Sequence, residues 1–167
     1  MVYLQRAIQP QGADHHHAEK PPDKVAQVRA RDLAKLTDPA AKNWRLAPNL
    51  KVVTTKSGLK YQDTRLGTGR SPKKGDTVAV DYAGWKVDGR KFDCSLDPGR
   101  RPIMFHMGKG DVIKGWEEGV STMKIGGIRR LVIPPTLGYG ELGHPPMIEP
   151  NSTLVFMVRL IAIEPAK

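Results

Sequence analysis

The chain has 167 residues, a net charge of +10 and 39% hydrophobic residues. This is enough apolar material for one folded domain with additional chain, so folding requires no metal or disulfide. No apolar stretch approaches about 18 residues, which excludes a membrane-spanning helix. Residues 1–55 hold nine basic and five acidic groups and residues 56–167 hold eighteen and twelve. Because the basic groups form no dense block, nucleic acid is not an expected partner.

Residues 1–55 are predicted to be an N-terminal extension, mostly disordered, with one possible helix from Lys24 to Leu36. That segment has apolar residues at roughly helical spacing: Val25, Val28, Leu33 and Leu36. His15–His17 are adjacent and cannot all face one ion on a regular element, so we expect no metal there. A protein partner, if there is one, would dock on this extension.

Residues 56–167 are predicted to form one domain built mainly of strands. We expect strands at residues 59–61, 78–84, around 92, 103–106, 128–133 and 153–163. One helix is expected at residues 112–123, where apolar residues recur at helical spacing. Both faces of the last strand are largely apolar, which places it in the centre of the sheet. The sequence thus predicts an α+β fold with a curved antiparallel sheet around one short helix.

The motifs of the common enzyme chemistries are missing. The chain has no phosphate-binding Gly-rich loop followed by Lys-Ser/Thr, no HExxH, no Cys/His cluster and no GxSxG. By elimination, this favours a function that needs only an apolar pocket and a few hydrogen bonds, without a cofactor.

Three segments carry a family resemblance: VDYAGWKVDGRKFDCS, MGKGDVIKGWEEGVSTMKIGG and LVIPPTLGYGELGHPPMIEPNSTLVFMVRL. Over about residues 57–164 the chain resembles the FKBP-type peptidyl-prolyl cis-trans isomerases. The resemblance implies an antiparallel half-barrel around a single helix. It also implies a shallow apolar pocket that receives the proline of a polypeptide, or a macrolide such as tacrolimus or rapamycin.

The resemblance places the substrate-binding residues in these motifs. They are Tyr82, Phe92, Asp93, Ile103, Val112, Ile113, Trp116, Tyr139, His144, Ile148 and Phe156. Asp93, Tyr139, Tyr82 and Phe92 are the candidates for the catalytic step. The backbone N–H of Ile113 and the hydroxyl of Tyr139 would donate to substrate carbonyls, and Asp93 would meet the twisted carbonyl or orient Tyr82.

Three points stay open in the sequence. The basic partner of Asp93 is either Arg100 or Arg101. Ile103 stands where an aromatic residue is common in the family, which should weaken macrolide contact. Cys94 is interpreted either as an oxidisable thiol at the pocket edge or as a buried, inert cysteine.

Two functions remain in competition. The retained pocket residues favour an active isomerase that assists protein folding, and the alternative is a binding module or assembly subunit with little activity. The start, MVYLQRAIQP, has no apolar signal core, so the default location is cytoplasmic. The lead-in TTKSGLKYQDTRLGTG resembles bacterial and plastid family members, which keeps an organelle lumen as the alternative.

Overall fold

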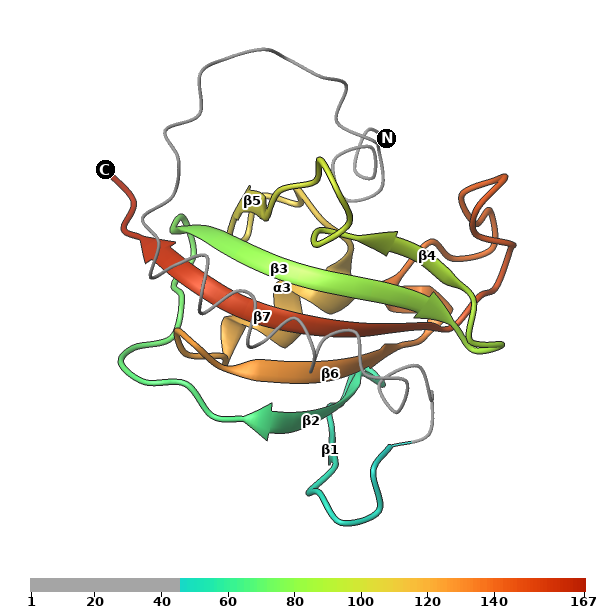
Figure 1. Ribbon diagram of the computed structural model, residues 1–167, viewed down its shortest axis with the longest axis horizontal. Coiled ribbons are helices and arrows are strands. Elements are labelled where there is room, and N and C mark those ends of the chain that lie inside the picture. The colour runs from blue at the N-terminus through green and yellow to red at the C-terminus, as the bar shows by residue number, and fades with distance from the viewer. Residues whose placement is uncertain (1–45) are drawn as a thin grey trace.

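The computed structural model describes residues 46–167, and these fold as one curved antiparallel sheet around one α-helix (Figure 1). The elements are β1 (Val53–Thr54), β2 (Lys60–Arg65), β3 (Thr77–Lys86), β4 (Lys91–Cys94), β5 (Ile103–His106), α3 (Lys114–Ser121), β6 (Ile128–Ile133), a 3-10 turn (Pro135–Leu137) and β7 (Leu154–Glu164). The strand order is β1-β2-β6-β7-β3-β4, with β5 also paired to β3. The curved antiparallel sheet around one short helix is therefore confirmed.

Strand β7 lies between β6 and β3, as its two apolar faces predict. It pairs with β3 from Lys86↔Leu154 to Thr77↔Glu164, which makes these two long strands the axis of the sheet. Strands β5 and β6 occupy the predicted ranges, residues 103–106 and 128–133. Strand β1 precedes residue 55 and pairs with β2, so part of the expected extension belongs to the sheet.

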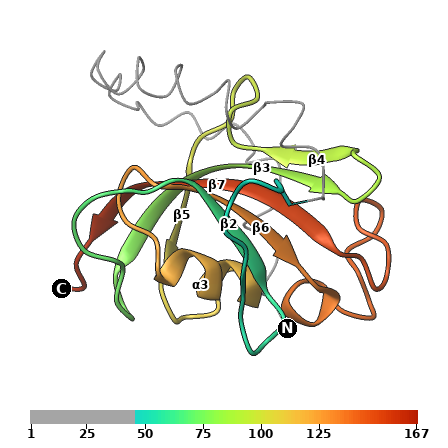
Figure 2. The same ribbon diagram turned by 90° about the horizontal axis from the view of Figure 1, so that it is seen from below.

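Helix α3 packs against one face of the sheet, which we call the inner face (Figure 2). Its buried residues are Gly115, Trp116, Gly119 and Val120. A Cβ atom on Gly119 would lie 2.6 Å from the side chain of Leu131 on β6, and one on Gly115 would lie 2.6 Å from Ile133. Two glycines on the buried side therefore let the helix backbone approach β6 closely.

The helix is shorter than the predicted range of residues 112–123. It begins after Ile113, whose ψ of 149° is extended, and it ends before Thr122. Val112 and Met123 are nevertheless buried in the core, so their apolar side chains come from the flanking turns. Periodicity found the buried residues correctly but could not locate the ends of the helix. No helix among the described residues has the length and apolar content that crossing a bilayer requires.

Candidate functional site

An aromatic cluster lies on the inner face, where β3, β4, β7 and α3 meet. The ring of Trp116 contacts Tyr82 and Phe156 edge to face, with centroids 4.9 and 5.3 Å apart. Phe92 makes the same kind of contact with Phe156 at 5.5 Å. Such edge-on pairs fix the rings in one arrangement. Phe92 is the most exposed of the four, and the other three rings are buried beneath it.

The local backbone explains how Phe92 and Asp93 can both reach this face although they are adjacent on β4. Gly84 of β3 pairs with Asp93 while its neighbour Trp85 pairs with Lys91, so the register shifts and Phe92 has no opposite residue. A β-bulge of this kind can turn two consecutive side chains to the same side. Gly84 also makes room, since a Cβ there would lie 2.6 Å from the Phe156 ring and 2.8 Å from the Phe92 ring.

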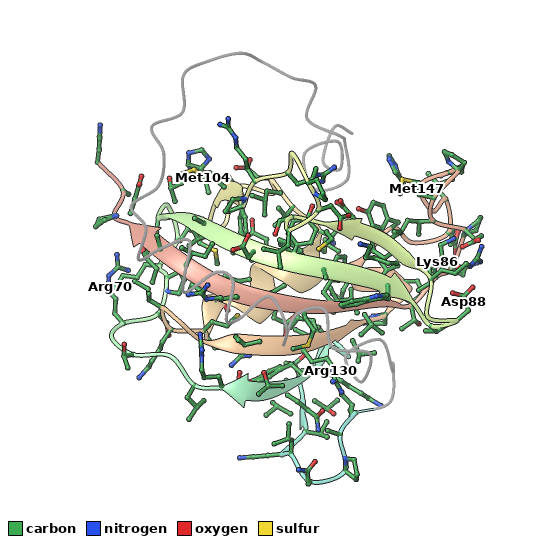
Figure 3. All side chains as sticks on the ribbon, viewed as in Figure 1. Arg70, Lys86, Asp88, Met104, Arg130 and Met147 are labelled. Carbon is green, nitrogen blue, oxygen red and sulfur yellow. The ribbon has the colours of Figure 1, made fainter. Side chains whose placement is uncertain are left out.

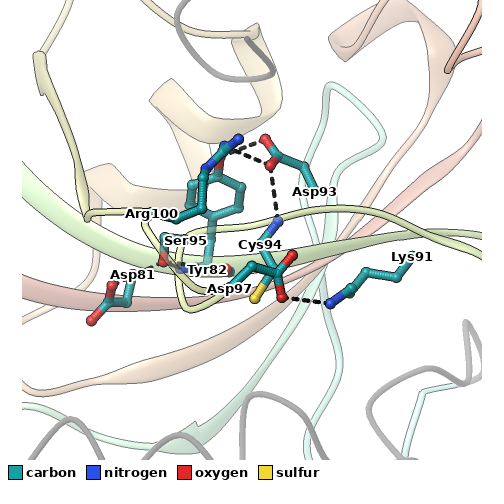
Figure 4. A network of polar contacts seen from close by, with 8 residues as sticks. All are labelled: Asp81, Tyr82, Lys91, Asp93, Cys94, Ser95, Asp97 and Arg100. Atoms are coloured by element: carbon teal, nitrogen blue, oxygen red, sulfur yellow. Dashed lines mark hydrogen bonds and ion pairs between the residues drawn. The ribbon is translucent and has the colours of Figure 1, made fainter. Parts of the chain in front are cut away.

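A buried polar network borders the cluster (Figure 4). The hydroxyl of Tyr82 donates to Oδ2 of Asp93 at 2.5 Å, and the guanidinium of Arg100 donates to Oδ1 of Asp93 at 2.7 Å. The backbone N–H of Cys94 donates to the same Oδ1 at 2.9 Å. Of the two candidate partners, Arg100 is thus the one that pairs with Asp93. The loop of residues 96–102 delivers a fixed positive charge to the edge of the aromatic cluster.

Burial sets the protonation of these groups. It raises the pKa of the Asp93 carboxyl above 3.8, although the hydrogen bond from Tyr82 and the charge of Arg100 act in the opposite direction. Burial also raises the pKa of Tyr82, and the nearby charge of Asp93 adds to this rise. The Tyr82 hydroxyl therefore keeps its proton near neutral pH and serves as a donor.

Ser95 holds the strand behind Tyr82 and was not found from the sequence. Its hydroxyl donates to Oδ1 of Asp81 at 2.9 Å and accepts the backbone N–H of Tyr82 at the same distance. The side chain of Ser95 is fully buried. A small polar residue after a strand is too common a pattern to predict such a role.

The loop between the 3-10 turn and β7 supplies Tyr139 and His144, whose rings lie 5.5 Å apart. The Tyr139 hydroxyl is buried and no described residue is its hydrogen-bond partner. Burial raises the pKa of Tyr139, with a smaller effect from the charge of Asp93, so this hydroxyl is also protonated near neutral pH. A protonated hydroxyl without a protein partner suits a donor to a bound carbonyl group.

Val112 and Ile113 form the turn that enters α3, and both side chains are in the core together with Trp116. The N–H of Ile113 has no partner among the backbone bonds of the described residues, as is usual at a helix N-terminus. Ile103 on β5 is also in this core and pairs with Val80. Ile148 is fully buried and exchanges two backbone hydrogen bonds with His144.

The structure thus brings together most of the predicted site residues. Tyr82, Phe92, Trp116 and Phe156 form one cluster, and Asp93 is bonded to its edge. Ile103 and Ile148 contribute packing beneath the site, because almost none of their surface is exposed. Cys94 lies among buried residues on the opposite face, and burial raises the pKa of its thiol, which agrees with an inert cysteine.

The described chain is thus an antiparallel half-barrel around one helix, with four clustered aromatic side chains beside a Tyr82–Asp93–Arg100 network. The family model described as "FKBP-type peptidyl-prolyl cis-trans isomerase" matches residues 68–161. This chain belongs to that family.

The relatives include proteins of very different length. FK506-binding protein 4 of Dictyostelium discoideum is 50% identical over 115 residues, which are 69% of this chain and 31% of that protein. FkpA of Escherichia coli is 42% identical over 149 residues, 84% of this chain and 54% of that protein. An FK506-binding protein of Neisseria meningitidis is 45% identical over 106 residues, 64% of this chain and 96% of that protein. The chain therefore spans about a third to a half of the longer relatives.

Solved structures agree with this assignment. The crystal structure of FkpA from Escherichia coli is 41% identical to the chain, with a TM-score of 0.66, and the match covers 87% of this chain and 65% of that one.

Proposed function

We propose that this protein accelerates cis/trans rotation about X-Pro bonds in other polypeptides and so assists their folding. The observation that carries the proposal is the aromatic cluster of Tyr82, Phe92, Trp116 and Phe156 beside the Tyr82–Asp93–Arg100 network. The cluster suits the compact, apolar ring of proline. The network supplies polar groups at its edge without any nucleophile or metal.

The chemistry of the X-Pro bond explains why such a site is sufficient. Amide resonance opposes rotation with a barrier of about 18–20 kcal/mol, whereas the cis and trans forms of X-Pro differ by only about 0.5–1 kcal/mol. The protein therefore has to lower a barrier and need not drive an equilibrium. In the twisted transition state the carbonyl oxygen carries less negative charge than in the planar amide. An apolar site favours the twisted form relative to water, which is differential binding of the transition state.

The polar groups then fix the orientation of the bound peptide. In this proposal Tyr139 and the N–H of Ile113 donate to two substrate carbonyls, since neither has a partner among the described residues. Asp93 holds Tyr82 in place and faces the carbonyl that leaves the plane. Phe92, which is the most exposed of the four rings in the cluster, contacts the residue before proline, so we expect an apolar preference at that position.

The natural ligands in this proposal are proline-containing polypeptides. Tacrolimus and rapamycin are the expected small-molecule ligands, in line with relatives that are named FK506-binding proteins. The aliphatic side chain of Ile103 in β5 offers no ring for stacking, so macrolide binding should be weaker than with an aromatic residue there.

An exchange assay tests the proposal directly. The full chain is added to a Leu-Pro or Phe-Pro peptide, and the rate of cis/trans exchange is measured by NMR. We expect the exchange to be much faster than the uncatalysed exchange, which takes tens of seconds or more. Binding of the peptide is measured in the same samples. Binding without acceleration would overturn the isomerase proposal and favour the binding module.

A further inference from the structure

An ion-pair network ties the hairpin between β3 and β4 to the loop of residues 138–153, which we call the site loop. Nζ of Lys86 donates to Oε1 of Glu149 at 2.9 Å, and Nη2 of Arg90 lies 3.6 Å from the same oxygen. Nε of Arg90 also donates to Oδ2 of Asp88 at 2.6 Å. Four charges of alternating sign therefore join two segments of the chain, with Lys86 and Glu149 separated by 63 positions in the sequence.

Backbone hydrogen bonds fix the hairpin side of this network. The N–H of Lys86 donates to the carbonyl of Arg90 at 2.9 Å, and the N–H of Gly89 donates to the carbonyl of Lys86 at 3.0 Å. The carboxylate of Asp88 accepts the N–H of Arg90 at 2.9 Å. Figure 3 shows Lys86 and Asp88 at the end of the sheet where Met147 of the site loop also lies. The hairpin thus offers two cations at fixed positions beside the loop.

One arm of the site loop connects Glu149 to Tyr139. Ile148, the residue before Glu149, exchanges two backbone hydrogen bonds with His144. The ring of His144 lies 5.5 Å from the ring of Tyr139. The N–H of Gly143 donates to the carbonyl of Tyr139 at 3.1 Å. The place of Glu149 therefore affects the place of both rings.

The other arm of the site loop returns to the same point. The hydroxyl of Ser152 donates to the carbonyl of Glu149 at 2.6 Å, which closes a turn there. Inside this turn the N–H of Asn151 donates to the carbonyl of Gly140 at 2.9 Å, and Gly140 directly follows Tyr139. The turn that carries Glu149 is thus bonded to the chain on both sides of Tyr139.

We propose that Lys86 and Arg90 are positioning residues, which act through Glu149 to hold the site loop where Tyr139 and His144 meet the bound peptide. This role rests on the proposed isomerase function, in which the Tyr139 hydroxyl donates to a substrate carbonyl. When only part of the molecules have the loop in place, the apparent affinity falls by that fraction. A bound peptide selects the correct loop arrangement, so the rotation rate at saturation stays the same.

The exposure of the network sets the size of the effect. Glu149 and Arg90 are more than half exposed, and an exposed ion pair changes an equilibrium constant by at most about fivefold. The hydrogen bond from Lys86 lowers the pKa of Glu149, so this carboxyl is ionised near neutral pH. Salt screens such charges, and at about 1 M the screening length is only about 3 Å. The contribution of the network should therefore shrink in concentrated salt.

The affinity of an uncharged Leu-Pro peptide and its exchange rate at saturation, both measured by NMR on the full chain, test this role. We expect Lys86→Met to weaken binding by about two- to fivefold and to keep the saturated rate within about twofold. Lys86→Arg keeps the charge and should bind as the unchanged chain does. In a chain that already carries Glu149→Gln, Lys86→Met should have no further effect. Lys60→Met, which removes the same charge from an exposed position on β2, is the matched control and should change neither quantity.

Amide hydrogen exchange in the site loop gives a readout that does not need catalysis. The N–H groups of Gly143, Ile148 and Asn151 donate within the loop, and Lys86→Met should make them exchange about two- to fivefold faster. The N–H of Thr68 donates to Ile125 in a different loop and should exchange at an unchanged rate. A uniform increase that includes Thr68 would overturn the proposal, because it would show a general loss of stability.

Failure of this role differs from failure of the isomerase function. If the unchanged chain does not accelerate X-Pro exchange, the function fails, and the peptide affinity and the amide exchange still decide the role of Lys86. Unchanged affinity and unchanged loop exchange in Lys86→Met would overturn the positioning role. A lower saturated rate at unchanged affinity would overturn it as well, because Lys86 would then act on the barrier to rotation.

Discussion

Asp93 lies at the edge of the aromatic cluster and is paired there with the charged side chain of Arg100. Its carboxylate accepts hydrogen bonds from Tyr82, Arg100 and the backbone N–H of Cys94, yet burial still raises its pKa. A carboxylate with these partners is held in one orientation, so it positions the Tyr82 ring as the wall of the aromatic cluster. The activity of Asp93→Asn separates this positioning role from a direct electrostatic role, and the pH dependence of stability checks the raised pKa.

The activity is measured as a pH profile. Since the pKa of Asp93 is raised above 3.8, its ionised form is lost as the pH falls through the interval just above that value. We expect kcat/KM for an X-Pro peptide to fall over this interval, whereas Asp93→Asn should remove this pH step and lower the rate by roughly tenfold at neutral pH. Complete loss of exchange in folded Asp93→Asn that still binds peptide would contradict the proposal that the apolar site itself favours the twisted transition state.

Folding stability should depend on the ionisation of Asp93 in the opposite direction to most carboxyl groups, whose pKa is lowered by folding. A carboxyl whose pKa is higher in the folded than in the unfolded state binds protons more tightly when folded. Ionisation of Asp93 therefore costs stability, and this cost appears as the pH rises through the same interval. The difference in unfolding free energy between the unchanged chain and Asp93→Asn should vary with pH only there.

Tyr139 offers a separate test at the residue scale. Because its buried hydroxyl has no described partner, Tyr139→Phe removes no protein hydrogen bond. We expect the free energy of unfolding to stay the same or rise by up to about 1 kcal/mol, while the exchange rate falls by roughly tenfold. Urea unfolding and the exchange assay measure the two effects. Reduced stability with an unchanged rate would show that the hydroxyl is structural.

At the scale of elements, the close contact between α3 and β6 determines how the site is supported. Gly119→Ala would raise helix propensity by about 1 kcal/mol, but its Cβ would lie 2.6 Å from Leu131. Overpacking costs about 1–3 kcal/mol, so we expect a net loss of stability in urea unfolding. Leu131→Val shortens the opposing side chain. The loss of unfolding free energy in the double variant Gly119→Ala/Leu131→Val should therefore be smaller than the sum of the losses in the two single variants. Simple additivity would contradict the proposed steric contact.

The elements also show what periodicity can and cannot predict. Strands β5 and β6 were located correctly because each is short, apolar and bounded by turn residues. The bulge that turns both Phe92 and Asp93 inward depends on the register between β3 and β4, and no local pattern encodes a register. The pairing of Asp93 with Arg100 rather than Arg101 depends on the path of the loop, which the sequence likewise leaves open.

At the scale of the whole molecule, the two faces of the sheet serve different purposes. The inner face holds α3 and the aromatic cluster, and the opposite face carries a second buried cluster with Trp85 and Met157. The sequence predicted the inner face because family motifs mark it. It did not predict the second cluster, because the alternation of residues along a strand shows which side chains share a face and not how exposed that face is. The boundary expected at residue 55 stays a prediction, and the contacts of Ala47, Leu50 and β1 favour an earlier one.

Removal of residues 1–45 tests this division of the molecule. A chain that starts at Leu46 keeps β1 and the hydrogen bonds of Gln62 to Ala47 and Leu50. We expect it to unfold cooperatively, because residues 46–167 contain every strand and the helix of the described fold. The exchange rate on an X-Pro peptide should stay within about threefold, a change of under 1 kcal/mol in the barrier, because the aromatic cluster is built from residues of β3, β4, α3 and β7 alone. Urea unfolding and the exchange assay on the same preparation measure both quantities. Loss of cooperative unfolding would mean that residues 1–45 are needed for the fold, and a lost rate in a folded chain would mean that they form part of the site.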